Sequence, residues 1–309
     1  MSIDPITGKR ILVTGVTGWV AGPLATSLAA AGNTVYGAAR FADESKRAPL
    51  EAQGVRTVSI DLASGRFDEV PAVDLVLHLA VSKANRFAVD MAANADGSAD
   101  LLAAAHERNP ALEAFFHCSS TAVYQPAGHV ALREDAPLGD SHRSMGMATY
   151  SITKIAGEVL VRHTAKRLGV PTVIARLNVP YGDTYGWMLF HLIMMERGMA
   201  VPVHTDAPTT FSPIHADDIA ASIPYLLSLA SIPATPVNWG GPDVVSIEEW
   251  CAELGRLTGL EPTFAPTEAT IPAIVPDLEL QASTGFRPSV HWADGMRRMV
   301  ATSRPDLLR

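Results

Sequence analysis

The feature that most constrains the fold is a glycine-containing turn between an apolar strand and a helix near the start of the chain. Residues 10–15 read Arg-Ile-Leu-Val-Thr-Gly, a short apolar run that is typical of a buried parallel strand. A helical run over about residues 19–31 follows, and Gly32 closes it as a C-terminal cap. Residues 33–40 form the next apolar run. Together these segments predict two parallel strands joined by a helix.

The turn itself, residues 14–21, reads Thr-Gly-Val-Thr-Gly-Trp-Val-Ala, which is a G-x-x-G-x-x-A pattern. Gly15 allows the tight turn, and Gly18 lets the backbone approach a pyrophosphate held at the helix N-terminus. Ala21 is small enough for close packing of the helix on the strand. In this strand–turn–helix setting the pattern predicts a dinucleotide site, and a purely structural turn is the alternative.

Strand and helix patterns continue to alternate along the first 180 residues. Apolar, β-rich runs are expected at residues 55–62, 73–81, 114–120 and 170–177, and helices at about residues 88–106 and from Tyr150 onward. Strands that alternate with helices predict an α/β fold, a doubly wound parallel Rossmann sheet with helices on both faces.

After Val179 the alternation loosens, and prolines and glycines separate the helices expected near residues 187–197, 217–230 and 246–257. We predict that residues 1–179 form a dinucleotide-binding Rossmann domain, to which residues 214–241 return. Residues 180–213 and 242–309 are predicted to form a smaller substrate-binding lobe against the sheet.

A second motif, Tyr-Ser-Ile-Thr-Lys at residues 150–154, opens a predicted helix. Four residues apart on a helix, Tyr150 and Lys154 project side by side. Because a neighbouring ammonium favours the phenolate, we expect the pKa of Tyr150 to fall from about 10 toward the working pH. The tyrosine would then be a usable proton donor or acceptor. A coincidental pair on a solvated helix is the alternative.

The charge balance restricts the partners of the chain. The formal net charge is −8, from 24 Lys and Arg against 32 Asp and Glu, and the basic residues form no run. This argues against nucleic acid or an anionic membrane as a partner. Two long uncharged spans, residues 11–39 and 219–242, are broken by glycines and prolines, so we expect no membrane helix.

The first ten residues lack the apolar centre of a signal peptide, and the chain has only two cysteines, Cys118 and Cys251. Two cysteines provide neither a disulfide framework nor a metal cluster, so we predict no metal site. Both lie in apolar runs and are predicted to be buried thiols, which fits a cytoplasmic protein.

Over nearly its full length the chain resembles the extended short-chain dehydrogenases/reductases, the group that includes sugar-nucleotide epimerases and dehydratases. The resemblance rests on TGVTGWVA at residues 14–21, Asp61-Leu62, His78-Leu79-Ala80, Asn94 to Ser98, Ser119 to Tyr124, the Tyr150–Lys154 motif and Ile214 to Ala220, in the family's order. It implies that Ser120 polarises a substrate oxygen, that Tyr150 passes the proton, and that Lys154 holds the nicotinamide ribose. Asn94 is either a hydrogen-bonding residue at a helix start or a direct catalytic part.

The resemblance also implies a set of cofactor-binding residues. They are Gly15, Thr17, Gly18, Trp19 and Val20 in the turn, then Arg40, Asp61, Leu62, Leu79, Ala80, Val81, Tyr150, Lys154 and Val179. NAD enzymes place an acid at the end of the second strand to bind the ribose hydroxyls, but this strand ends in Arg40. An arginine there suits a 2′-phosphate, so we predict NADP, with NAD as second choice; a solvent-facing arginine is the alternative.

The sequence departs from its sugar-nucleotide relatives in the second half. Where they carry an arginine that binds the diphosphate, this chain has Phe211, and Arg197 is the single basic residue other than histidine between residues 178 and 254. A nucleotide diphosphate needs several charged donors, so a smaller and less charged substrate is expected. The segment of residues 176–182 also departs, with Asn178 one place early. Residues expected to line the pocket by position are His142, Met145, Met147, Trp187 and His191.

We therefore predict an NADP-preferring oxidoreductase that interconverts a small carbonyl compound and its alcohol, with Tyr150 as proton donor or acceptor. The second hypothesis is a sugar-nucleotide epimerase or dehydratase that retains NAD. The third is a non-catalytic dinucleotide sensor, although such proteins commonly lose the tyrosine or lysine. A homodimer is the habit of the family.

Overall fold

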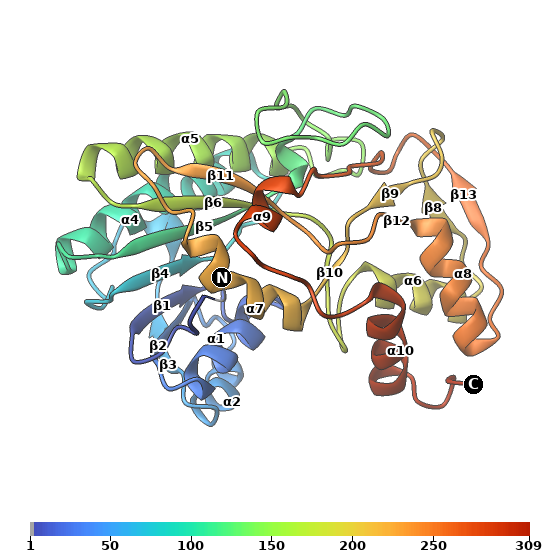
Figure 1. Cartoon of the computed structure of the whole chain (residues 1–309), viewed down its shortest axis with the longest axis horizontal. Helices are drawn as coiled ribbons and strands as arrows, with labels where there is room; N and C mark the ends of the chain where they lie inside the picture. The colour runs from blue at the N-terminus through green and yellow to red at the C-terminus, as the bar shows by residue number, and fades with distance from the viewer. Residues whose placement is uncertain (1–2) are drawn as a thin grey trace.

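The computed structural model describes residues 3–309 and places seven parallel strands in one central sheet (Figure 1). The strand order is β11-β6-β5-β4-β1-β2-β3. The strands are β1 (Arg10–Thr14), β2 (Thr34–Ala39), β3 (Arg56–Ser59), β4 (Leu75–His78), β5 (Ala114–Ser120), β6 (Thr172–Leu177) and β11 (Thr235–Trp239). The order reverses at β1, where β2 and β4 lie on either side, so the predicted doubly wound Rossmann sheet is confirmed.

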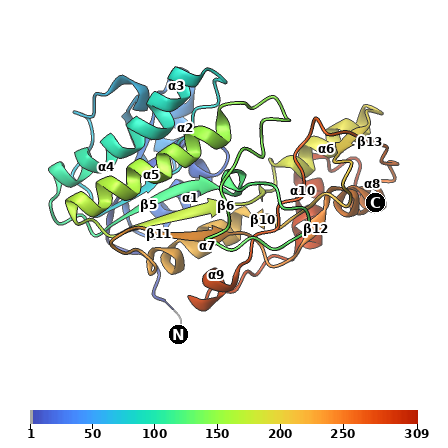
Figure 2. The ribbon, with the colours of Figure 1, turned by 90° about the horizontal axis from the view of Figure 1, so that it is seen from above.

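Helices cover both faces of this sheet. On one face α1 (Ala21–Ala30) and α7 (Ala216–Leu227) pack against Val13 and Phe116 in one apolar core. On the other face α4 (Gly97–Arg108) and α5 (Tyr150–Leu168) lie side by side (Figure 2) and pack over Leu12 and Phe115. The strands are apolar on both sides because both sides are buried. A short helix, α2 (Arg47–Glu51), follows β2.

The second half of the chain builds a smaller body at the other end of the molecule (Figure 1). Its elements are β7 (Pro180–Tyr181), α6 (Trp187–Glu196), β8 (Val201–Val203), β9 (Thr210–Phe211), β10 (Ile214–His215), β12 (Val245–Ser246), α8 (Ile247–Thr258), β13 (Phe264–Pro266) and α10 (Trp292–Ser303). Met188, Trp250 and Met296 belong to a core of its own. The short helix α9 (Glu279–Ser283) lies instead beside β11, where Leu280 packs against the core of the sheet. The division into a Rossmann domain and a substrate-binding lobe remains our proposal.

One predicted helix is interrupted. Instead of a single helix over residues 88–106, the chain forms α3 (Phe87–Met91), a π-helical turn (Ala92–Asp96) and then α4. A π-helical turn contains one residue more than an α-helical turn. The side chain of Asn94, within this turn, accepts a hydrogen bond from the Ser82 N–H and donates one to the Ser82 carbonyl. The strands predicted at residues 55–62 and 73–81 also end early, because residues 60–62 and 79–81 leave the sheet to line a cavity.

The described residues contain no helix long and apolar enough to cross a membrane. Cys118 and Cys251 are free and buried, as predicted.

A buried ion pair joins α5 to the sheet. Arg176 on β6 donates from Nη2 to Glu158 Oε2 at 2.8 Å, and their side chains are only 5% and 8% exposed. Ser119 on β5 donates to the same carboxylate, and Arg176 also donates to Tyr124. Removing one partner of such a pair leaves an uncompensated charge in the interior.

We expect Glu158→Ala to lower the free energy of unfolding by about 3–5 kcal/mol, the usual effect of breaking a buried pair from one side. The control is Glu113→Ala, which breaks an exposed pair with Lys9 and should lower the free energy of unfolding by less than about 1 kcal/mol. Urea unfolding of both variants measures the difference. Equal losses would show that the buried pair adds nothing to stability beyond an exposed one.

Candidate active site

Two adjoining cavities lie at the carboxyl ends of the parallel strands, where the order of the sheet reverses. Leu79 and Val81, just after β4, line both cavities. Open α/β sheets bind their ligands at this position, because strand ends and helix N-termini converge there. The first cavity lies over β1 and β2, and the second extends toward the smaller body.

The first cavity contains the glycine turn, whose shape requires its glycines. Gly15 has φ +80°, and a Cβ there would lie 2.8 Å from the Ala80 Cα. Within residues 3–309 the backbone N–H groups of Thr17, Trp19 and Val20 have no acceptor, and the first turn of α1 carries no acidic residue. Free N–H groups at a helix N-terminus fit the pyrophosphate of a dinucleotide.

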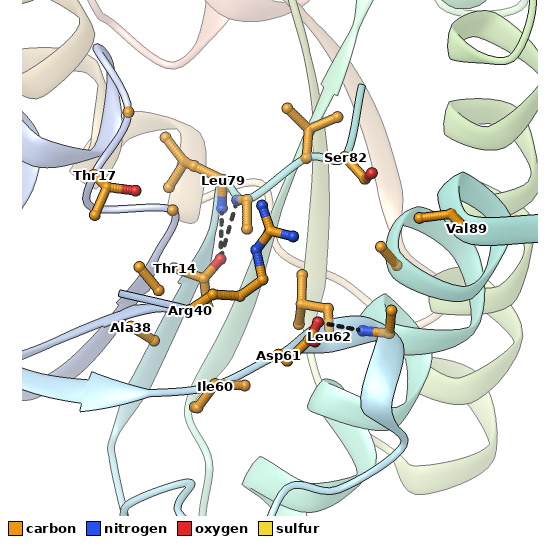
Figure 3. A pocket seen from close by; sticks show the side chains of 17 residues that line it. Thr14, Thr17, Ala38, Arg40, Ile60, Asp61, Leu62, Leu79, Ser82 and Val89 are labelled. Atoms are coloured by element: carbon orange, nitrogen blue, oxygen red, sulfur yellow. Dashed lines mark hydrogen bonds between the residues drawn. The ribbon is translucent and has the colours of Figure 1, made fainter. Parts of the chain in front are cut away.

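Arg40 and Asp61 stand on the floor of the same cavity. Figure 3 shows the Arg40 side chain extending into the cavity between Thr14 and Asp61, and its guanidinium pairs with no carboxylate of the described chain. The next residue, Phe41, has φ +46° and is buried in the core, so the chain turns sharply and leaves Arg40 at the cavity. Asp61 accepts from the Ala63 N–H at 3.1 Å.

The second cavity holds the three residues predicted to be catalytic. Ser120 ends β5, and Tyr150 and Lys154 lie on the first turns of α5. The Lys154 Nζ donates to the carbonyl oxygen of Cys118 at 2.8 Å, and its side chain is buried. The sequence motif therefore does bring the phenol, the ammonium and the serine hydroxyl together in one cavity.

The predicted pKa of Tyr150 is wrong for this structure. We expected Lys154 to lower it, but burial raises the pKa of Tyr150 to about 12, against a smaller lowering effect of the Ser120 hydroxyl. Burial also lowers the pKa of Lys154, whose ammonium is directed to the Cys118 carbonyl. Desolvation of the phenolate thus outweighs the charge of the neighbouring lysine when no cofactor is bound.

All of the predicted cofactor residues line one of the two cavities. Gly15, Thr17, Gly18, Arg40, Asp61, Leu62, Leu79, Ala80 and Val81 line the first, and Trp19, Val20, Tyr150, Lys154 and Val179 line the second. Of the pocket residues expected by position, His142, Met145, Met147 and Trp187 line the second cavity. His191 does not, because it is buried behind the wall and accepts from Trp250 Nε1 at 2.9 Å.

Asn94 lines neither cavity, but its side chain connects the segment after β4 to α5. Its side-chain oxygen accepts from the Ser82 N–H at 2.6 Å, and its amide nitrogen donates to the Ser82 carbonyl and to the Thr153 hydroxyl. Asn94 therefore forms structural hydrogen bonds, from a π-helical turn and not from the helix start that the sequence suggested. Asn178 also holds neighbouring segments together. Its amide nitrogen donates to the Thr121 hydroxyl and the Ile274 carbonyl, and its side-chain oxygen accepts from the Ser212 N–H.

Part of the lining of the second cavity is apolar. Phe211, Trp187 and Ile274 line it, and the Trp187 and Phe211 rings meet edge to face with centroids 5.4 Å apart. No arginine and no carboxylate lies among the lining residues of this cavity within the described chain. The structure thus places Phe211 where the sequence comparison suggested that a charged donor is missing.

Lys83 and Ile274 are among the lining residues of the second cavity that were not predicted from the sequence. Lys83 could have been found, because it is a cation only two residues beyond Val81 at the end of a predicted strand. Ile274 lies in an irregular segment between β13 and α9, where neither periodicity nor a motif marks it.

Comparison with known proteins agrees with this geometry. The sequence matches the NAD dependent epimerase/dehydratase family over residues 11–237. A dTDP-4-dehydro-6-deoxy-D-allose reductase of Streptomyces bikiniensis is 27% identical over 327 residues, which cover 94% of this chain and 98% of the relative. UDP-glucuronate 4-epimerase 6 of Arabidopsis thaliana is 31% identical over 194 residues, covering 57% of this chain and 40% of the relative.

Solved structures share the fold at low identity. UDP-glucose 4-epimerase of Thermotoga maritima, solved with UDP-glucose, has a TM-score of 0.81 at 18% identity and covers 96% of this chain and 99% of that one. UDP-glucuronic acid 4-epimerase of Bacillus cereus, solved with NAD, has a TM-score of 0.79 at 21% identity, covering 94% and 96%. From the family match and the two cavities together, we conclude that the chain belongs to the NAD-dependent epimerase/dehydratase family and is an NAD(P)-dependent enzyme of the extended short-chain dehydrogenase/reductase type.

Proposed function

We propose that the enzyme interconverts a carbonyl compound and its alcohol by net hydride transfer, and that its substrate carries no nucleotide diphosphate. The observation that carries this proposal is the second cavity, whose lining combines Ser120 and Tyr150 with the apolar Phe211 and Ile274. Recognition of a diphosphate requires several charge-assisted donors, and the lining of this cavity contains no arginine and only one cation, Lys83, besides Lys154. Net reduction also fits the Streptomyces relative, which is named a reductase and matches nearly the whole chain.

The chain's own residues would divide the work as follows. The Ser120 hydroxyl donates to the substrate oxygen and polarises the carbonyl, and the Tyr150 hydroxyl gives its proton to the same oxygen. The bound nicotinamide supplies the hydride that reaches the carbonyl carbon. Lys154 and the glycine turn would hold the cofactor, the lysine through its ribose hydroxyls and the turn through its free N–H groups. The apolar wall keeps water from the reacting atoms.

We expect Tyr150→Phe to bind the cofactor normally and to lose about 10²–10⁴-fold in turnover, because proton transfer to the substrate oxygen is removed. Tyr225→Phe, on α7, is the control and should keep full activity. Nicotinamide absorbance during incubation with NADPH or NADH and a panel of small ketones and aldehydes measures turnover. Retained activity in Tyr150→Phe would remove this tyrosine from the mechanism.

The second candidate is a sugar-nucleotide epimerase or dehydratase that retains its cofactor. The relatives favour it, since the Arabidopsis protein is an epimerase of UDP-glucuronate and the Bacillus cereus enzyme was solved with NAD. The same absorbance assay separates the two candidates when UDP- and dTDP-linked sugars join the panel. Conversion of a sugar nucleotide with no net oxidation of NADPH or NADH would favour the epimerase or dehydratase.

We further propose that NADP is preferred to NAD. Arg40 supports this, since its unpaired guanidinium reaches into the cavity beside Asp61 and no acid stands at the end of β2. The NAD in the Bacillus cereus structure is the observation against it. A homodimer and a cytoplasmic location stay predictions.

Arg40→Ala should weaken NADPH binding by about 1.5–3 kcal/mol, the range for a hydrogen bond to a charged group, and should leave NADH binding unchanged. Quenching of tryptophan fluorescence by each cofactor gives both dissociation constants, with NADH as the internal control. Equal losses for the two cofactors would contradict a role for Arg40 in binding the 2′-phosphate.

The pH dependence should follow the raised pKa of Tyr150. A pKa near 12 keeps the phenol protonated through neutral and mildly alkaline pH, and reduction uses the protonated form. The reduction rate should therefore stay level as the pH rises through this range, while the reverse oxidation, which uses the phenolate, should increase. Stopped-flow rates in both directions measure this. A reduction rate that falls through the neutral range would show that cofactor binding lowers the pKa of Tyr150.

A further inference from the structure

Lys83 places an unpaired ammonium in the second cavity. Its Nζ lies 5.3 Å from the centroid of the Tyr150 ring. Within residues 3–309 it forms neither an ion pair nor a hydrogen bond, whereas the Lys154 ammonium in the same cavity donates to the Cys118 carbonyl. The nearby His142 adds no charge at neutral pH, because burial lowers its pKa to about 4. Lys83 is thus the cation available to a ligand beside Tyr150.

The backbone on both sides of Lys83 is held in place. Asn94 bonds both the N–H and the carbonyl of Ser82, and Asp90 accepts from the Ala84 N–H at 2.9 Å. Asn94 and Asp90 are both buried. An irregular loop with anchors on either side of one residue keeps that residue at a fixed position.

The same two anchors also bind the helix that carries Tyr150 and Lys154. The Thr149 hydroxyl donates to Asp90 at 2.6 Å, and the Asn94 amide donates to the Thr153 hydroxyl at 3.0 Å. Thr149 directly precedes Tyr150, and Thr153 directly precedes Lys154. The loop of Lys83 and the start of α5 are therefore one unit, and buried hydrogen bonds hold the Lys83 backbone beside the helix that carries Tyr150.

From this arrangement we propose that Lys83 is a specificity-determining residue that binds the carboxylate of the substrate. The substrate class is an oxo- or hydroxycarboxylic acid with an apolar body, whose carbonyl lies at Tyr150 and whose body packs on Phe211 and Ile274. The proposal rests on the proposed function and names its substrate class.

The cavity fits one negative charge and not several. Its lining contributes one unpaired ammonium, Lys83, and its remaining walls include Met147, Trp187 and Phe211. A carboxylate is satisfied by one ammonium, and the charge-assisted hydrogen bond to the exposed Lys83 side chain is stronger than a neutral one. A phosphate of the cofactor is a poorer match, because the free N–H groups of the glycine turn already serve it and Lys83 does not line the first cavity.

The test measures binding to the full chain loaded with NADP⁺, so that it does not depend on turnover. The probes are benzoylformate and its uncharged methyl ester, which share an aryl ketone and differ in the charge. Isothermal titration should show that the wild type binds benzoylformate about tenfold to a hundredfold more tightly than the ester, the range for a charged hydrogen bond. In Lys83→Met this ratio should fall to about one, and Lys83→Arg should keep it above one.

Lys166→Met, which removes an exposed lysine at the far end of α5, is the matched control and should keep the wild-type ratio. The proposal is overturned if the wild type shows no preference for the anion or binds neither probe, or if Lys83→Met keeps the preference. It is also overturned if Lys83→Met weakens NADPH binding and leaves the ratio intact, which would assign the ammonium to the cofactor.

This design separates the two proposals. If the preference depends on Lys83 but no ketone is reduced, the proposed function fails and the carboxylate site stands. If Tyr150-dependent reduction occurs without any preference for the anion, the proposed function stands and the role of Lys83 fails.

Discussion

A buried chain of hydrogen bonds holds the rest of the site in place. The Thr14 hydroxyl accepts from the Leu79 and Ala80 N–H groups, so its own proton goes to His78 Nδ1 at 2.7 Å. His78 Nε2 then donates to Ser98, and Ser98 donates to the Asn94 carbonyl. Burial lowers the pKa of His78 to about 3, so the ring stays neutral and keeps this one tautomer. These hydrogen bonds join the ends of β1 and β4 to the π-helical turn.

Solvation decides the electrostatics around Tyr150. The residues alone suggest that an adjacent ammonium must make the phenol acidic, yet both groups lie where their charged forms lose water, and their pKa values shift toward the neutral forms. The Lys83 side chain, in contrast, is exposed to solvent, and its ammonium lies 5.3 Å from the centroid of the Tyr150 ring. A ligand of opposite charge would supply the ion pair that Lys83 lacks within residues 3–309.

The sequence was sufficient for features that local pattern determines. The glycine turn, the alternation of strands and helices and the spacing of Tyr150 and Lys154 each depend on neighbouring residues, and the structure shows them as expected. The π-helical turn and the burial of His191 outside the cavity depend on contacts across long stretches of sequence. Asn94 forms a hydrogen bond with Thr153, and His191 with Trp250, and the partners of each pair are 59 residues apart. Neither a hydrophobic period nor a motif predicts contacts of this kind.

The path of the chain between sheet and smaller body has a consequence for synthesis on the ribosome. Strand β6 pairs with β5 on one side and with β11 on the other. Because β11 follows α6 and β8 in the sequence, it is synthesised only after them. In turn, the core around Met188 of α6 needs Trp250 of α8 and Met296 of α10. The sheet is therefore completed only after the first part of the smaller body has been translated, and the smaller body only after the whole sheet. A ribosome-bound chain that stops near residue 230 exposes an open sheet edge and unpacked methionines, which are binding sites for chaperones.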